Sequence, residues 1–439
     1  MTGDHLVSSL LLILYTFIYV VFYLKLRRKR AYFGPTSLTL LVYGILGVCS
    51  IIVYIDKDLS NLYEGYGKLT FFPFLYLITI VLLVLKPTVR LEKYYDLKIQ
   101  KPSNNLVVYF LIFYAVCSLA IFPNTLSRIQ DGLQILFFSA DGGQNLYTEG
   151  QLDDGRNFFK YIGVQSILSV FHDSLNEISI LLMFYYLTFK KKHTGLIILL
   201  SIAFVADLLK PIASGQRTGF VLTMLSIVLC YLIFRRYWDT KLQQVASKIL
   251  IVLVVIVSIP FIALTISRFS LSQEGTTGST LSYLGQANLN FNLYCLDAGG
   301  TRHGDRVVRG FKSVLGMETT NSTRDTREKY SNMKIDDRVF YTYVGDFVLD
   351  FGLILATFIL LAYALIVNSV TLLRGHTIKF HQLLVLYFSL AISLKGSFYL
   401  FPYAYSGNQI IAAFFLMYIV FKFDCMNQSF RHSYLTINN

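Results

Sequence analysis

The sequence predicts an all-α polytopic membrane protein with about eleven transmembrane helices. Of its 439 residues, 54% are hydrophobic and only 15% are charged, whereas a soluble domain carries about 25% charged residues. The mean hydropathy is +0.54. Apolar runs recur along the whole chain at the length, about 20 residues, that a helix needs to cross a bilayer core. This composition excludes a soluble enzyme, a disordered chain and a disulfide scaffold.

Eleven apolar runs are candidate membrane spans, and we expect them to form a single integral membrane domain over residues 1–439. The first run is not expected to be a cleavable signal peptide, because its basic cluster follows the apolar stretch instead of preceding it. The runs lie near residues 6–24, 38–55, 70–86, 105–122, 161–189, 195–211, 218–234, 248–266, 341–368, 381–400 and 407–423.

The segments between the runs alternate in charge. A basic cluster, Lys25 to Arg30, follows the first run, and basic residues follow every odd-numbered run after it. These six regions hold 21 basic and four acidic residues, which gives them a net charge of +17. The rest of the chain has a net charge of −4, so the total is +13. Because basic loops stay in the cytoplasm, the pattern predicts an external N-terminus and a cytoplasmic C-terminus. The charge excess therefore indicates orientation, and nucleic acid is not expected as a partner.

Two of the segments predicted to be external are long. A first external loop covers residues 123–160, and a large external loop covers residues 267–340, between the eighth and ninth spans. Within the large loop, residues 305–312 space apolar and basic side chains as an interfacial helix does. Residues 318–325 are polar and predict a flexible turn.

Ionisable residues within the runs are functional candidates, because charge is costly in a bilayer. Asp173 and Glu177 in the fifth run share one helix face; the alternative is an amphipathic turn outside the membrane. Asp207 and Lys210 end the sixth run, either shaping a cavity or neutralising each other at the interface. Lys395 lies inside the tenth run and could neutralise a nearby acid.

An arginine stands in a short segment of small residues before the seventh run. Arg217 belongs to the stretch Ser214–Gly219, which predicts a tight hairpin that leaves the guanidinium accessible. Arginine suits a planar, bidentate hold on phosphate oxygens better than lysine does. The alternative is an arginine that extends to the membrane interface without a ligand.

Two carboxylates begin the ninth run. Asp346 and Asp350 are four residues apart, and either could act as a general base toward a sugar hydroxyl if burial raised its pKa. A structural role for at least one of them is the alternative. Four loop residues add positive charge and could instead form a solvated or lipid-facing basic patch: Arg302, His303, Arg306 and Arg309.

No metal or nucleotide cofactor is expected. The seven histidines are scattered, and the sequence contains no H-E-x-x-H, Walker A, dinucleotide-binding or nucleophile-elbow pattern. The five cysteines include no C-x-x-C pair, so a structural zinc or redox motif is not expected either.

Two short segments, with the overall layout, resemble a known family. Ser214–Gly219 is similar to the small-residue arginine turn of the Wzy-type O-antigen and capsule polymerases. Tyr343–Gly352, which ends in Asp-Phe-Gly, is similar to the segment that follows the large loop of these proteins. The related O-antigen ligases share the layout but usually carry a histidine motif after the large loop. Arg338 and Asp346 stand near that place instead, which favours a polymerase.

The resemblance implies a fold similar to the GT-C class and a metal-independent glycosyltransferase acting on undecaprenyl-pyrophosphate-linked oligosaccharide repeat units. The reaction would take place at the periplasmic face of a bacterial inner membrane. Asp346 or Asp350 would take the acceptor proton, and Arg338 would stabilise the leaving group. A polysaccharide chain-length regulator is a further partner that the family allows. The residues assigned to the pyrophosphate are Arg217, Arg338, Lys210, Arg302 and His303.

Three other functions remain open at this point. An O-antigen ligase shares the layout, and a lipid-linked oligosaccharide flippase or other transporter would also be polytopic. Against a transporter stand the size of the large loop and the absence of a visible internal repeat. A multi-spanning acyltransferase is the weakest alternative, because such enzymes usually show a catalytic histidine.

Overall fold

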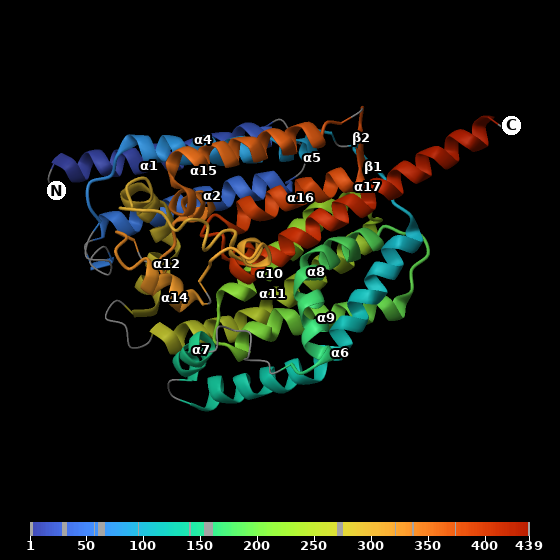
Figure 1. The fold of residues 1–439 in the computed structure, drawn as a ribbon, viewed down its shortest axis with the longest axis horizontal. Helices are drawn as coiled ribbons and strands as arrows, with labels where there is room; N and C mark the ends of the chain where they lie inside the picture. Colours follow the sequence, from blue (N-terminus) through green and yellow to red (C-terminus); the bar gives the residue numbers. More distant parts are fainter. Residues whose placement is uncertain are drawn as a thin grey trace. The chain divides into compact units, whose positions relative to one another are not determined.

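A computed structural model describes residues 3–28, 33–56, 58–59, 66–94, 96–139, 142–152, 161–269, 275–320, 322–335, 338–373 and 375–437. The chain divides into two compact units, residues 1–101 with 277–439, and residues 102–276. Helices make up most of both units (Figure 1). That the whole chain forms a single integral membrane domain stays a prediction.

The first unit contains six long helices whose inner faces are rich in buried tyrosines. The rings of Tyr19 and Tyr43 stack 5.0 Å apart and join the first two helices. The helix that begins at Phe380 packs against four of the others. The six are α1 (Gly3–Arg28), α2 (Pro35–Ile55), α4 (Phe71–Leu85), α15 (Thr342–Val370), α16 (Phe380–Lys395) and α17 (Asn408–Ile437).

Short elements complete the first unit. Two three-residue strands, β1 (Lys98–Gln100) and β2 (Thr377–Lys379), pair in parallel. The shorter helices are η1 (Lys86–Val89), α5 (Arg90–Lys93), α12 (Gly275–Asn290), η3 (Phe291–Cys295), α13 (Arg309–Val314), α14 (Thr323–Lys329), η4 (Phe401–Tyr403) and η5 (Tyr405–Gly407).

The second unit is a bundle in which α6 packs against both α8 and α9, while α10 packs against α8 and α9 in turn. Its apolar core includes Leu208, Ile212 and Phe220. Its helices are α6 (Asn104–Phe138), α7 (Gly142–Leu152), α8 (Val164–Tyr186), α9 (Thr194–Ala213), α10 (Thr218–Phe234), η2 (Arg235–Tyr237) and α11 (Thr240–Phe269).

The prediction of an all-α polytopic membrane protein is confirmed. Among the described residues, ten helices are long and apolar enough to cross a membrane, and each lies on a predicted run. The helix of the tenth run, α16, is shorter and ends at Lys395 instead of residue 400. Beyond it, the carbonyls of Gly396 and Phe398 accept hydrogen bonds from Tyr343 and Thr342 at 2.7 and 2.6 Å. The chain therefore pairs with the start of α15 instead of continuing the helix.

The predicted first loop, residues 123–160, is partly helical in the structure. Helix α6 continues past residue 122 to Phe138, and α7 follows it. Leu136 and Leu146 from this segment are buried in the core of the second unit. These sides of α6 and α7 therefore face the core of the unit. Residues 153–160 lie outside the described residues.

The large loop also contains a helix that enters the first unit. On α12, Asn288 accepts a hydrogen bond from Tyr15, in the middle of α1, at 2.8 Å. Ser50 of α2 donates to the carbonyl of Gly285 at 2.7 Å. A methyl group on Gly285 would lie 2.8 Å from the Cys49 carbonyl oxygen, so only glycine allows this approach. The Asn288 side chain and the Gly285 carbonyl thus find partners on α1 and α2, as a low-dielectric interior requires.

Helix α15 is broken at one residue. Gly352 has φ 75° and ψ 163°, a conformation that a side chain disfavours, so the first turns are offset from the long apolar remainder. The break directly follows Asp350 and Phe351, in the Asp-Phe-Gly triplet of the sequence. It frees backbone carbonyls near the end of the first segment, and those carbonyls need other donors.

Candidate functional site

The segment before α13 supplies the donors that the broken helix lacks. The amide of Arg302 donates to the carbonyl of Leu349 at 2.8 Å, and that of Gly304 to the carbonyl of Asp350 at 3.3 Å. Gly304 has φ 79°, which permits the tight turn that brings both amides to the helix. The break in α15 thus fixes residues 302–308 against its first turns.

Two arginine–aspartate pairs lock this contact. Arg302 Nε lies 2.7 Å from Asp350 Oδ1, and Arg306 Nε lies 2.9 Å from Asp346 Oδ1. The aspartate side chains are fully buried, and the arginine side chains are 4% and 2% exposed. Because each charge has an opposite partner within hydrogen-bond distance, the four can be buried together; any one of them alone would be very costly.

Backbone donors and a tyrosine occupy the remaining atoms. Asp350 Oδ2 accepts the amides of Arg306 at 3.1 Å and Val307 at 2.6 Å. The hydroxyl of Tyr341 accepts hydrogen bonds from both guanidiniums, at 2.8 Å from Arg302 and 2.7 Å from Arg306. The tyrosine and the backbone amides therefore tie both ion pairs into one buried polar network.

Two predictions for this segment are wrong. Arg302 and Arg306 are buried, so they do not form the solvated or lipid-facing basic patch that the sequence allowed. Residues 305–312 are not one interfacial helix, because α13 begins only at Arg309. The amides of residues 306 and 307 bind the Asp350 carboxylate instead of continuing a helix. Arg309 itself is half-buried, with its guanidinium 5.3 Å from the Tyr405 ring centre.

A third carboxylate anchors α14 to the same segment. Asp305 is buried and bonds to Lys312, to Lys329 at 2.9 Å and to the Tyr330 hydroxyl at 2.7 Å. Burial opposes ionisation of this carboxyl, but the three donors outweigh it and hold the pKa of Asp305 below its ordinary value. Burial and the Asp305 carboxylate raise the pKa of Tyr330 to about 12. The hydroxyl therefore stays a donor at neutral pH.

Helix α14 corrects another prediction. Residues 318–325 were expected to be a flexible turn, but Ser322 and Asp325 form a reciprocal capping box that begins the helix. Each side chain accepts the other residue's backbone amide at 3.0 Å. Asn321 lies outside the described residues.

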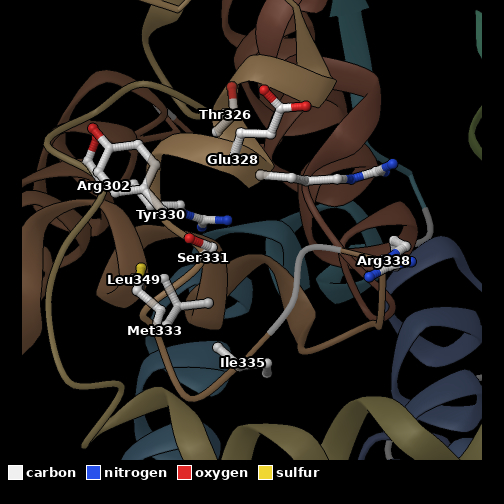
Figure 2. A pocket seen from close by; sticks show the side chains of 10 residues that line it. Arg302, Thr326, Glu328, Tyr330, Ser331, Met333, Ile335, Arg338 and Leu349 are labelled. Carbon is white, nitrogen blue, oxygen red and sulfur yellow. The ribbon is translucent and has the colours of Figure 1, made fainter.

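A pocket of about 340 Å³ lies between α14, the start of α15 and the segment that joins them (Figure 2). That volume is within the range of small-molecule sites, roughly 300–1,000 Å³. Three arginines and one glutamate contribute charge, and the Arg302 charge is matched by the buried aspartates. The residues that line it are Arg302, Thr326, Arg327, Glu328, Tyr330, Ser331, Met333, Ile335, Arg338 and Leu349.

The pocket brings together Arg302 and Arg338, both predicted to bind pyrophosphate. Arg338 is exposed and lies across the pocket from Arg302 and Tyr330 in Figure 2. Asp346 and Asp350 are not among the lining residues, and their oxygens face arginines and backbone amides. This geometry favours the structural role that the sequence left open as the alternative, and a role of either aspartate as general base stays a prediction.

A second polar cluster lies in the second unit, between α6, α8 and α9, with His172 and Asp207 buried and Asp173 and Lys210 partly exposed. Lys210 pairs with Asp173 at 2.9 Å, while Asp207 accepts hydrogen bonds from Tyr114 at 3.0 Å and lies 3.3 Å from His172. The expectation that Asp207 and Lys210 neutralise each other is therefore wrong, because each has a nearer partner on α8. These groups hold three helices together inside an apolar bundle.

Arg217 precedes α10 in the same unit and is only 6% exposed. The expected accessible guanidinium is not found, because α7 packs directly on the hairpin. Gly215 has φ 58°, and a Cβ there would lie 2.7 Å from the backbone nitrogen of Tyr147. Pyrophosphate binding by Arg217 stays a prediction.

The remaining candidates have separate environments. His303 is exposed and has a positive φ of 52°. Its carbonyl accepts a hydrogen bond from Lys312 at 3.2 Å. Lys395 is buried with its ammonium 5.7 Å from the Tyr403 ring centre. Glu177 is buried on α8. His303 does not line the pocket, and no role for these three residues is tested.

Sequence reasoning missed Arg327, Glu328 and Tyr330, all of which line the pocket. The Ser-x-x-Asp signature before them could have indicated a helix start, but nothing in the sequence shows which way that helix faces.

The described residues contain no group of three His, Cys, Asp or Glu side chains arranged to hold a metal ion. An Asp-x-Asp triplet begins at Asp56, whose carboxylate accepts the amides of Asp58 and Leu59 and so caps the chain locally.

No protein-family model matches this chain, and neither a curated protein nor a solved structure is similar to it.

Proposed function

We propose that this protein is a membrane glycosyltransferase that polymerises lipid-linked oligosaccharide repeat units. It transfers a growing glycan from undecaprenyl pyrophosphate to the hydroxyl of an incoming repeat unit, producing O-antigen or capsular polysaccharide. The reaction takes place on the periplasmic side of a bacterial inner membrane, with the N-terminus outside and the C-terminus in the cytoplasm.

The arginine-lined pocket is the observation that carries this proposal. The donor glycan is already activated because its leaving group is a lipid pyrophosphate. The protein therefore needs mainly to position the donor and to stabilise the charge that develops on the pyrophosphate. Guanidiniums are suited to this because their planar fork matches phosphate oxygens. Arg338 is exposed at the pocket and Arg327 is half-buried beside it. We assign the pyrophosphate to these two residues.

The rigid base of the pocket supports the same function. Arg302 contributes a pocket wall while its charge is held by Asp350 and Asp346. A wall that is fixed before substrate binds lowers the cost of orienting the reacting groups. The aspartates therefore act through geometry, because they hold the loop on α15.

The membrane setting supplies the rest of the argument. A polyprenyl carrier requires an enzyme embedded in the bilayer, and the ten long apolar helices meet that requirement. The charge of the loops favours an external position for residues 267–340, and hence for the pocket. Pyrophosphate binding by Arg217, in the second unit, remains a prediction.

A deletion strain tests the proposed function against its alternatives. Loss of a polymerase should leave single repeat units on the surface, seen as one band above lipid core on a glycan gel. Loss of a flippase should leave the units in the cytoplasm with nothing displayed, and loss of a ligase should leave full-length polymer on its lipid carrier. Either of the last two patterns would refute the proposal.

A further inference from the structure

The transfer reaction needs a group that accepts the proton of the attacking hydroxyl, and the two predicted aspartates are already engaged. Asp346 Oδ1 is held by Arg306 at 2.9 Å and Oδ2 accepts the Leu400 amide at 2.6 Å. Asp350 is held on one oxygen by an arginine and on the other by two amides. Neither presents an oxygen to the pocket.

A different carboxylate does line the pocket. Of the lining residues that the structure describes, Glu328 alone is acidic. Its side chain is 65% exposed, and Oε1 pairs with Arg324 Nε at 2.9 Å across one helical turn. Arg324 is 80% exposed and does not line the pocket. An ion pair this exposed is weak, so it leaves the carboxylate available to a ligand.

We propose that Glu328 is the general base of the transfer reaction, an inference that rests on the proposed function. The Glu328 carboxylate takes the proton of the acceptor sugar hydroxyl while that oxygen forms a bond to the anomeric carbon of the donor. The bond between the anomeric carbon and the pyrophosphate oxygen breaks, and its electron pair leaves with the pyrophosphate. No oxidant, reductant or further reactant is needed.

The placement of charge in the pocket fits this division of labour. Arg327, next to Glu328 on α14, and Arg338, from the segment before α15, face the leaving group. Glu328 and Arg338 lie on different sides of the pocket in Figure 2. The base and the leaving-group clamp therefore lie on separate elements. The anchoring of α14 through Asp305, Lys329 and Tyr330 keeps that separation fixed.

Glu328→Gln in the full-length chain tests the assignment, because glutamine keeps the shape but cannot accept the proton. A general base contributes roughly 10²–10⁴-fold to rate, so we expect polymer on the glycan gel to fall at least about 100-fold. The purified variant should bind undecaprenyl pyrophosphate within about threefold of the wild type. Glu318→Gln, an exposed acid of the same loop outside the pocket, is the matched control and should give a normal ladder.

Two further variants separate chemistry from structure. Arg324→Gln removes the ion pair and should leave the ladder normal; a loss equal to that of Glu328→Gln would mean that only the pair matters and would overturn the assignment. Loss of undecaprenyl pyrophosphate binding in Glu328→Gln would make the residue a binding group, which also overturns it. A normal ladder in Glu328→Gln would also overturn the assignment. This would be clearest if the double variant with Asp336→Asn and Asp337→Asn abolished polymer. In these cases a deletion strain that displays single repeat units still supports the polymerase itself.

Discussion

The buried pair of Arg302 and Asp350 should be the main attachment of the large loop to α15, and Asp350→Asn is its most direct test. The aspartate is fully buried, lies 2.7 Å from Arg302 Nε and accepts the amides of Arg306 and Val307. Removing one member of a buried ion pair costs about 3–5 kcal/mol, since the other charge stays buried without compensation. Because asparagine can still accept the backbone amides, we expect the lower value, about 3 kcal/mol.

Hydrogen exchange of the full-length chain in detergent measures this loss locally. At about 1.4 kcal/mol per tenfold change, exchange of the Arg306 and Val307 amides should rise about 100-fold in Asp350→Asn. Asp297→Asn is the matched control, because Asp297 pairs with Lys334 in the same loop but their side chains are 81% and 53% exposed. Such a pair contributes about 0–1 kcal/mol, so exchange should change less than about fivefold. Equal exchange in both variants would refute the structural role of Asp350.

Three further changes test the same structure. Arg302→Leu with Asp350→Leu should lower the thermal unfolding midpoint by less than the two single changes added together, because no lone charge is left buried; additive losses would contradict the pairing. Because the pKa of Asp305 is depressed, its carboxylate stabilises the loop at pH values above the ordinary aspartate pKa, about 3.9. This stabilisation is lost as the pH falls below that value. Pepsin resistance of residues 305–330 should therefore drop below about pH 4 in the wild type, whereas Asp305→Asn should be cleaved readily at about pH 5 and show no such step. Gly215→Val should cost at least about 1–2 kcal/mol in thermal unfolding, because of its positive φ and the close Tyr147 backbone, whereas Gly195→Ala, in open space on α9, should be neutral or gain up to about 1 kcal/mol; equal effects would contradict the described hairpin.

The membrane spans could be predicted because burial in lipid imposes a simple requirement on length and composition. Every predicted run lies on a helix of the structure, including the long α6 and α11. The ends were harder to predict. The last turn expected for α16 is absent because Gly396 and Phe398 bond to α15, and such a contact between distant segments leaves no local signal.

The charged residues of the site were found, but their partners were not. Asp346 and Asp350 stood out because two acids begin an apolar run, and the arginines of the loop were recognised as candidates. Their pairing depends on the break at Gly352, which turns backbone carbonyls toward residues 302 and 304. A sequence shows the glycine but not the donors that its conformation requires.

The pocket depends on the same long-range contacts. Glu328 and Arg327 lie in a polar stretch that resembles an ordinary turn, and only the anchoring of Tyr330 to Asp305 directs their helix toward Arg338. In the second unit, Lys210 pairs with Asp173 and not with Asp207, which is nearer in sequence. Helical spacing identifies residues that share a face, whereas the partner is set by the neighbouring helix.

The central claim, that Arg338 holds the leaving pyrophosphate, is tested most directly by the surface glycan of a strain carrying Arg338→Ala. Arg338 is exposed at the pocket, so its removal should leave the protein level unchanged. We predict single repeat units without a ladder, as in the deletion strain, and a normal ladder for Arg324→Ala, an exposed arginine outside the pocket. Polymer of normal length and amount in the Arg338→Ala strain would contradict the claim.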